Sequence, residues 1–175
     1  MKNLSRTTIV FFIVLLLCHP PGFAEDVPPI KNFQVAGWVE NVSIFPGNMK
    51  IKAKLDTGAR NSSLNARNME EFYRDGDRWV RFKLKNWKGR TENFEAKIIR
   101  TATIKQHETD SVTRPVIHLG ICLGNVYKEV EVNLQDRGKF NYQMLVGRSF
   151  LRKSILVDSS ATFTVEPDCQ GATHK

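Results

Sequence analysis

The chain has 175 residues, a quarter of them charged, and a formal net charge of +8 at pH 7. This length fits one domain, and the sequence contains no internal repeat or low-complexity tract that would indicate an array or a disordered chain. The positive charge is scattered through alternating segments instead of forming a run, so we do not expect nucleic acid as a partner. It indicates either a soluble basic surface or an acidic partner.

The N-terminus has the pattern of an export signal. Basic residues precede an apolar run, Ile9–Cys18, and Ala24 supplies the small residue that signal peptidase needs. The run has about half of the roughly 20 apolar residues that a membrane-spanning helix requires. We therefore expect residues 1–24 to be a signal peptide, residues 25–33 a linker, and the protein to be periplasmic or secreted. Contact with a membrane is expected only if the signal segment is retained.

Alternation of apolar and polar residues follows the linker and predicts strands. It is clearest in residues 49–55, where apolar positions alternate with lysines, and it recurs in residues 80–84 and 94–98. Two apolar segments flank Gly124-Asn125 and predict a hairpin. Asp75-Gly76-Asp77 predicts another tight turn.

The C-terminal part predicts further strands at residues 155–157 and 161–165, and helix is expected only at residues 68–73 and after Gly147. Many short strands joined by tight turns predict an all-β fold, a small closed barrel with one or two short helices. We assign this domain to residues 34–166 and a C-terminal tail to residues 167–175.

Two cysteines remain after the signal segment. Cys122 and Cys169 could pair in an oxidising compartment and tie the tail to the domain. Burial of unpaired thiols would explain them equally well.

The tetrapeptide Asp56-Thr57-Gly58-Ala59 follows the strand at residues 49–55. A sheet can hold such an aspartate rigidly while its carboxylate faces a cleft, and the glycine allows a tight turn and close backbone approach. The threonine hydroxyl can bond to a neighbouring loop. Two such carboxylates at hydrogen-bonding distance share one proton, so one can activate water while the other protonates a carbonyl. A plain turn is the alternative.

Late in the chain, Leu145 and Val146 precede Gly147-Arg148 and a short amphipathic segment. These two motifs in this order resemble the retropepsin family. The resemblance covers residues 34–166 and points to a bacterial retropepsin-like aspartic peptidase family that is often labelled an ATP-dependent zinc protease. Some relatives of that family are similar to peptidases that trim glutamate tails and accompany glutamate ligases. Further matching segments are Val35-Ala36-Gly37-Trp38, Ile51 to Arg60, Arg78 to Phe82, Arg114-Pro115-Val116-Ile117 and Leu156-Val157-Asp158.

The resemblance implies that Asp56, Thr57 and Gly58 form the catalytic loop. It also implies that Gly147 allows a strand to approach this loop closely and that Arg148 forms a structural ion pair. The chain has a single Asp-Thr-Gly, and Asp158-Ser159-Ser160 lacks the glycine and is expected to close a turn. A working pair of carboxylates therefore requires a homodimer with one Asp56 from each chain.

The family pattern is broken at Arg60, where viral retropepsins usually carry an acidic residue. Arg148 must therefore find another partner, for which Asp136 is a candidate. Ala59 and Arg60 are expected to contact the substrate, and Arg60 to bind a carboxylate, with Lys52 and Lys54 adding positive charge nearby. This favours acidic peptides; a solvated surface arginine is the alternative.

Zinc and ATP dependence have little support in the sequence. His107 has no second histidine four residues away, and a Gly-rich phosphate loop is missing. We expect no metal and no cofactor. The alternatives to an aspartic endopeptidase are a non-catalytic binding or assembly module on the same scaffold and, with less support, a zinc metallopeptidase. Whether the long segment Gly89–Arg114 forms a flap is left open.

Overall fold

The computed structural model describes residues 33–105, 111–136 and 141–169. The chain divides into residues 1–31 and residues 32–175, and every described residue belongs to the second unit. The predicted signal peptide and nearly all of the predicted linker lie outside the described residues, so the predicted domain boundaries stay predictions.

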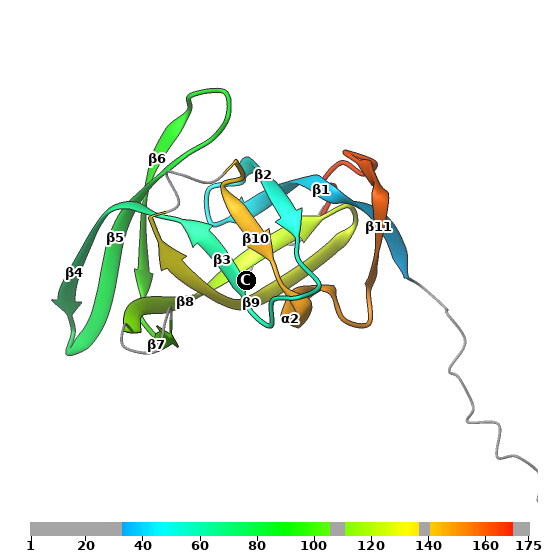
Figure 1. The fold of residues 1–175 in the computed structure, drawn as a ribbon. Coiled ribbons are helices and arrows are strands. Elements are labelled where there is room, and N and C mark those ends of the chain that lie inside the picture. The colour runs from blue at the N-terminus through cyan, green and yellow to red at the C-terminus, as the bar shows by residue number, and fades with distance from the viewer. Residues whose placement is uncertain (1–32, 106–110, 137–140, 170–175) are drawn as a thin grey trace, which may run out of the picture. The chain divides into compact units, whose positions relative to one another are not determined.

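Six strands close into a barrel (Figure 1). Around the ring each strand pairs with the next, and β8 returns to β1 through Ile44↔Ile121. β7 (Arg100–Lys105) extends the sheet beyond β8, and β11 (Ile155–Thr162) pairs in parallel with the start of β1. This architecture confirms the predicted small all-β barrel. The ring consists of β1 (Gln34–Phe45), β2 (Met49–Leu55), β10 (Met144–Val146), β3 (Ser62–Asn65), β9 (Val126–Gln135) and β8 (Ser111–Leu123).

The barrel interior is filled by the apolar residues that alternate with polar ones along the strands. In β2 the apolar residues Met49, Ile51, Ala53 and Leu55 are buried, whereas the intervening lysines are exposed or half-buried. The hairpin β8–β9 turns at Gly124-Asn125 as predicted. Helix α2 (Arg148–Leu151) follows Gly147 as predicted and adds Phe150 and Leu151 to the core.

A second, three-stranded sheet consists of β4 (Arg67–Arg74), β5 (Asp77–Lys85) and β6 (Thr91–Lys97). The prediction of helix at residues 68–73 is therefore wrong. Cross-strand contacts decide the outcome, because Phe72 pairs with Trp79 and the Arg74 guanidinium stacks 4.6 Å from the Trp79 ring. The predicted turn at Asp75-Gly76 joins β4 to β5, and both of these residues have positive φ.

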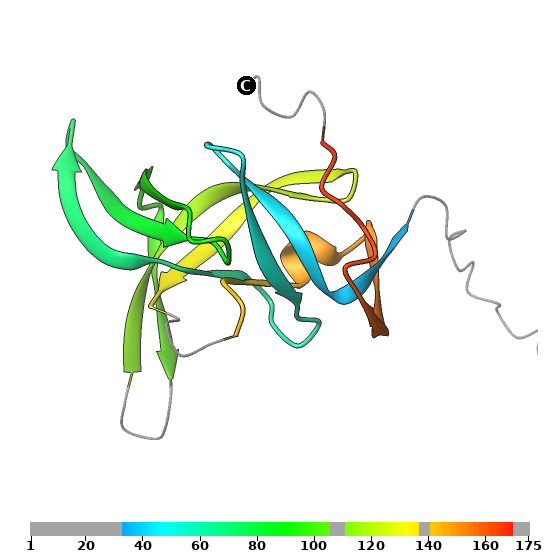
Figure 2. The same cartoon turned by 90° about the horizontal axis from the view of Figure 1, so that it is seen from above.

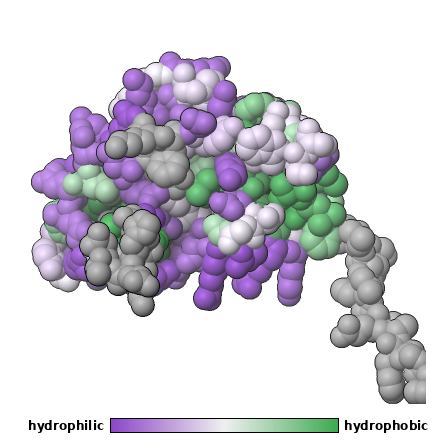
Figure 3. Space-filling view, viewed as in Figure 1, coloured by the Kyte–Doolittle hydropathy of each residue, from purple (hydrophilic) through white to green (hydrophobic). Residues whose placement is uncertain are grey.

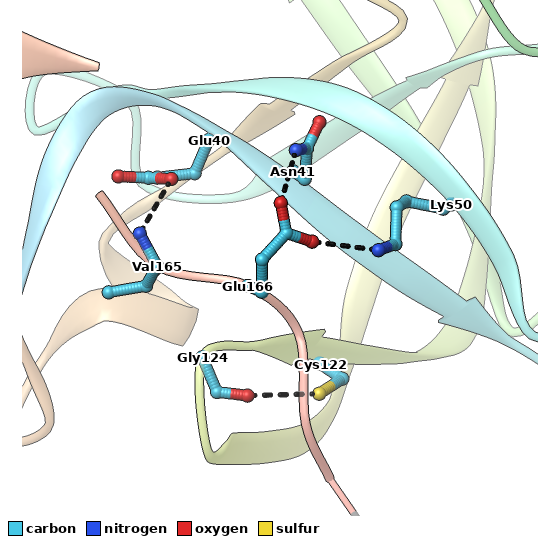
Figure 4. A network of polar contacts seen from close by, with 7 residues as sticks. All are labelled: Glu40, Asn41, Lys50, Cys122, Gly124, Val165 and Glu166. Atoms are coloured by element: carbon cyan, nitrogen blue, oxygen red, sulfur yellow. Dashed lines mark hydrogen bonds and ion pairs between the residues drawn. The ribbon is translucent and has the colours of Figure 1, made fainter. Parts of the chain in front are cut away.

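Residues 163–169, which we call the C-terminal strap, run along β1 to the tip of the β8–β9 hairpin (Figure 2). The predicted strand at residues 161–165 is thus only partly correct, since β11 ends at Thr162. Beyond it the strap amides donate to the side chain of Glu40, which is fully buried. Glu40 accepts from Thr164 N–H at 2.8 Å and, as Figure 4 shows, from Val165 N–H at 3.3 Å.

A disulfide between Cys122 and Cys169 fastens the end of the strap to the barrel. It settles the alternative left open by the sequence. The Cys122 sulfur lies 3.4 Å from the Gly124 carbonyl oxygen (Figure 4), a contact and not a hydrogen bond, because a disulfide sulfur carries no proton. No helix within the described ranges combines the length and hydropathy of a membrane-spanning segment.

Candidate active site

Asp56 lies immediately beyond the end of β2 and is held by backbone groups. Its N–H donates to the Val146 carbonyl at 2.8 Å, and its Oδ1 accepts from Gly58 N–H at 3.0 Å and Ala59 N–H at 3.3 Å. Within the described residues Oδ2 has no hydrogen-bond partner. The loop therefore orients the half-buried carboxylate through one oxygen and leaves the other available.

Strand β10 is threaded between β2 and β3 and supports this loop (Figure 1). It is parallel to β2, with Val146 opposite Leu55, and antiparallel to β3, with Met144 opposite Leu64. Two chain segments distant in sequence thus meet behind Asp56. This is the arrangement that the resemblance implied.

Gly147 is the point of closest approach. A Cβ there would lie 2.6 Å from both the carbonyl carbon and oxygen of Asn61, so only glycine fits without movement of the backbone. The Gly147 N–H donates to the Ser62 Oγ at 3.1 Å, and this bond joins the end of β10 to the start of β3, where the loop ends.

Arg148 binds the Asp56–Ala59 loop in a way that the sequence did not predict. Its Nη1 donates to the Thr57 carbonyl at 2.9 Å and to the Gly58 carbonyl at 2.7 Å, and its backbone N–H donates to the Ala59 carbonyl at 2.9 Å. Within the described residues these carbonyls, and not an acidic side chain such as Asp136, are its partners. The expected ion pair is replaced by a clamp that needs no carboxylate, which explains how Arg60 can stand at the usual acidic position.

Thr57 is exposed, and its hydroxyl has no hydrogen bond within the described part of one chain. The predicted bond to a neighbouring loop is therefore not formed among the described residues. Gly58 is also exposed, so the tip of the loop faces outward.

Two hollows flank the loop and meet at Arg60 and Asn61. The first, the arginine pocket, has a volume of about 320 Å³ and the second, the outer groove, about 1090 Å³. In Figure 3 hydrophilic side chains project below the region of β9 and α2. The arginine pocket is lined by Ala59, Arg60, Asn61, Ser63, Arg100, Ala102, Thr103, Ile104, Arg114, Val116, Asn133 and Leu145. The outer groove is lined by Arg60, Asn61, Lys128, Glu129, Val130, Glu131, Arg148, Ser149, Arg152, Lys153 and Ser154.

Arg60 lies where the sequence placed it, exposed beside the loop. Lys52 and Lys54 do not add positive charge beside Arg60, because neither of them lines the two hollows. The Lys52 Nζ lies instead 5.6 Å from the centre of the Trp87 ring and 5.2 Å from that of the Phe163 ring. Period two explains this, because the β2 lysines point away from the barrel interior.

The positive charge that we expected from Lys52 and Lys54 comes instead from Arg100 and Arg114. Both reach the arginine pocket from β7 and β8, so part of the segment Gly89–Arg114 forms one of its walls. The only signal for them in the sequence is alternation in β8, where Arg114 is two residues from buried Val116 and faces the same side of the sheet.

The remaining candidates are accounted for by local contacts. Asp158 lies within β11 and not in the predicted turn; hydrogen bonds from the Ser160 hydroxyl and N–H to its Oδ1 lower the pKa of its carboxyl. The described residues contain no group of three or more His, Cys, Asp or Glu side chains that could hold a metal ion.

Similar proteins were found at the level of sequence and of structure. The chain is 39% identical over 116 residues to a probable alpha-L-glutamate ligase of Shewanella pealeana and 32% identical over 111 residues to one of Desulfotalea psychrophila. The matches cover 65% and 62% of this chain but only 25% and 24% of the relatives, so the chain spans about a quarter of their length.

A crystal structure of a Legionella pneumophila protein of unknown function is 33% identical, with a TM-score of 0.66 over 75% of this chain and 98% of that one. The family model described as retropepsin-like aspartic endopeptidase RimB matches residues 35–168. The match confirms the family expected from the two sequence motifs: the chain belongs to the RimB-like family of retropepsin-like proteins.

Proposed function

We propose that this protein is an aspartic endopeptidase whose catalytic carboxylate is Asp56. The observation that supports this most is the asymmetric environment of that side chain. Oδ1 is fixed by two loop amides, whereas Oδ2 has no partner in the described part of the chain and remains free to bind a water or a second carboxyl group. A purely structural aspartate at a turn has no need of the close β10 packing and the Arg148 clamp behind it.

The reaction needs two carboxyl groups that share one proton. The ionised one takes a proton from water, whose oxygen attacks the scissile carbonyl carbon, while the protonated one donates to the carbonyl oxygen. The tetrahedral intermediate then collapses as the C–N bond breaks, and the leaving nitrogen receives the proton that the first carboxyl group took from water. Asp56 supplies one carboxyl group, and no Asp or Glu side chain lines the arginine pocket. Of the two that line the outer groove, Glu131 accepts a hydrogen bond from Arg100 and Glu129 lies 3.6 Å from the Nδ1 atom of His118.

The second carboxyl group is assigned to Asp56 of another copy of the chain. The exposed tip at Thr57 and Gly58 is free to meet its symmetry mate, and the start of β1 lies at the Asp56 end of antiparallel β2. There Val35 and Leu156 are direct neighbours across β1 and β11 and are 57% and 44% exposed. Apolar neighbours of this kind suit the centre of a subunit interface.

Acidic peptides are the substrates that the charge favours, since Arg60 and two further arginines face the arginine pocket. We place the activity in the periplasm or outside the cell, on the basis of the signal-like residues 1–24.

The test is digestion of a peptide library by the wild-type protein and by Asp56→Asn, with unfolding curves for both. Cleavage by the wild type, and its loss in a variant that unfolds at the same urea concentration, would support the proposal. Cleavage that persists in Asp56→Asn would refute it.

The shared pair of carboxylates has a test of its own. Wild type and Asp56→Asn are mixed under conditions that exchange subunits. If two copies of Asp56 are needed, an equimolar mixture keeps about a quarter of the activity of the same total amount of wild type, because only about a quarter of dimers pair two intact chains. Retention of half would show that each chain works alone.

The comparisons favour one second candidate, a non-catalytic module. The chain corresponds to about a quarter of proteins named as probable glutamate ligases, and a segment of an enzyme can serve binding or assembly. Peptide binding by the wild type without any cleavage, across acidic and neutral pH, would select this candidate.

A further inference from the structure

The floor of the arginine pocket is formed by three adjacent strands. Strand register places Arg100 opposite Val116 and Val116 opposite Asn133, across β7, β8 and β9. Arg114 lies two residues before Val116 and therefore on the same face. Both Arg114 and Asn133 line the pocket, and the loop residue Arg60 faces them from the other side.

The arginines differ in how their charge is balanced. Arg100 donates through Nε to Glu131 at 3.0 Å, and Glu131 is held ionised by this bond and by nearby positive charge. Arg114 has no such partner: it is half-buried, and its Nε is buried without a hydrogen bond in the described structure. Burial lowers the pKa of Arg114, which is the response expected of a desolvated cation without a counterion.

Asn133 adds a second unused group to the same floor. Its Nδ2 donates to the Ser62 carbonyl at 2.9 Å, which fixes the amide, while its Oδ1 is buried and accepts no hydrogen bond in the described structure. Leaving the buried Nε of Arg114 and the buried Oδ1 of Asn133 without partners costs free energy. The stability of the sheet therefore does not explain these two atoms, and together they offer a cationic donor and an acceptor to a ligand.

We propose that Arg114 is a specificity-determining residue that binds the carboxylate of an acidic side chain of the substrate, while Asn133 Oδ1 accepts an N–H of the same peptide. This inference rests on the proposed peptidase function, and it separates Arg114 from Arg60. Arg60 is exposed and attracts acidic peptides in a salt-sensitive way. Arg114 is half-buried on the pocket floor, so salt screens its charge less than that of Arg60, and a neutral side chain leaves its guanidinium without a counterion.

The test measures binding and needs no cleavage. Two peptides that differ only by glutamate or glutamine at one position are titrated into Asp56→Asn protein, and free glutarate is titrated as a third ligand. We expect the glutamate peptide to bind more tightly, and Arg114→Gln in the same background to weaken it by about ten- to hundredfold with little change for the glutamine peptide. Arg78→Gln, which removes a surface arginine from β5, should change neither affinity.

Stability distinguishes this role from a structural one. Arg114→Gln should unfold at the same urea concentration as its parent or a higher one, because it removes a half-buried charge that has no counterion in the described structure. The inference is overturned if the Arg114→Gln variant still prefers the glutamate peptide. It is also overturned if glutarate alone binds as tightly as the peptide, because the site would then bind a free carboxylate and not a peptide side chain. Failure of the wild type to cleave a peptide that Asp56→Asn binds with the expected preference would refute the peptidase proposal alone.

Discussion

Replacement of Gly147 by alanine tests whether the contact between β10 and the catalytic loop holds the site together. The new Cβ would lie 2.6 Å from the Asn61 carbonyl carbon and oxygen and 3.0 Å from the Arg60 oxygen. Non-bonded heavy atoms prefer about 3.5–4.0 Å, so the loop would have to retreat by roughly 1 Å. That movement stretches the hydrogen bonds to the Ala59 and Arg60 carbonyls from the Arg148 and Ser149 amides, each now 2.9 Å.

We expect a loss of about 3–5 kcal/mol in the free energy of unfolding. Overpacking of a rigid site costs about 1–3 kcal/mol, and each lost hydrogen bond adds about 1 kcal/mol. Peptide cleavage should fall as well, because the loop that moves carries the Gly58 and Ala59 amides that orient the Asp56 carboxylate.

The assay is urea unfolding of the wild type and of Gly147→Ala, with Gly89→Ala as the matched control. Gly89 has φ of +86° and no atom within 4 Å of its would-be Cβ, so alanine there costs only backbone strain, about 1 kcal/mol. If Gly147→Ala costs no more than Gly89→Ala, the loop yields easily and close packing does not position Asp56.

Three further variants probe other contacts. Glu40→Gln should destabilise the fold by about 2–4 kcal/mol in urea unfolding, because the amide turns a donor toward an amide of the C-terminal strap; Glu166→Gln, on the exposed part of the same strap, should cost less than about 1 kcal/mol. Arg148→Gln should lower kcat at least tenfold while circular dichroism stays unchanged, because the exposed clamp shapes the catalytic loop more than it stabilises the barrel. The hydrogen bond from Arg100 is the chief cause that lowers the pKa of Glu131 from 4.5. The ionised carboxylate therefore stabilises the fold above pH 4.5, and this stabilisation is lost as the pH falls through the folded pKa. In Glu131→Gln the free energy of unfolding should therefore depend less on pH in this acidic range.

Local patterns predicted the barrel well where one face of a strand is buried. Residues 49–55 form β2 within the predicted bounds, and Gly124-Asn125 turns the predicted hairpin. Residues 68–73 were misassigned because β4 is exposed along nearly its whole length and so lacks the apolar alternation that marks a strand. Its conformation is set by pairing with β5, which is a tertiary effect.

In the candidate site, too, local motifs were predictable from the sequence, whereas contacts between distant segments were not. Asp56 and Gly147 stand in motifs whose backbone requirements are visible in the sequence. The partners of Arg148 are backbone carbonyls, which carry no residue signature and become identifiable only when the loop is folded. The sequence marks Arg114 only as part of a segment that resembles the family, because its lack of a counterion among the described residues is a property of the pocket and not of its neighbours in the chain.

In the proposed reaction, substrate binding needs one chain and hydrolysis needs two. A single chain holds the arginine pocket complete, since Arg114, Asn133 and Arg60 all come from the same barrel. The same chain fixes just one of the two carboxyl groups that the proposed reaction needs, and the loop that carries Asp56 has the exposed residues Thr57 and Gly58 at its tip. Substrate affinity should therefore be independent of protein concentration, whereas hydrolysis should require two barrels to meet at that loop. On dilution a peptidase built this way loses turnover before it loses its preference for acidic side chains.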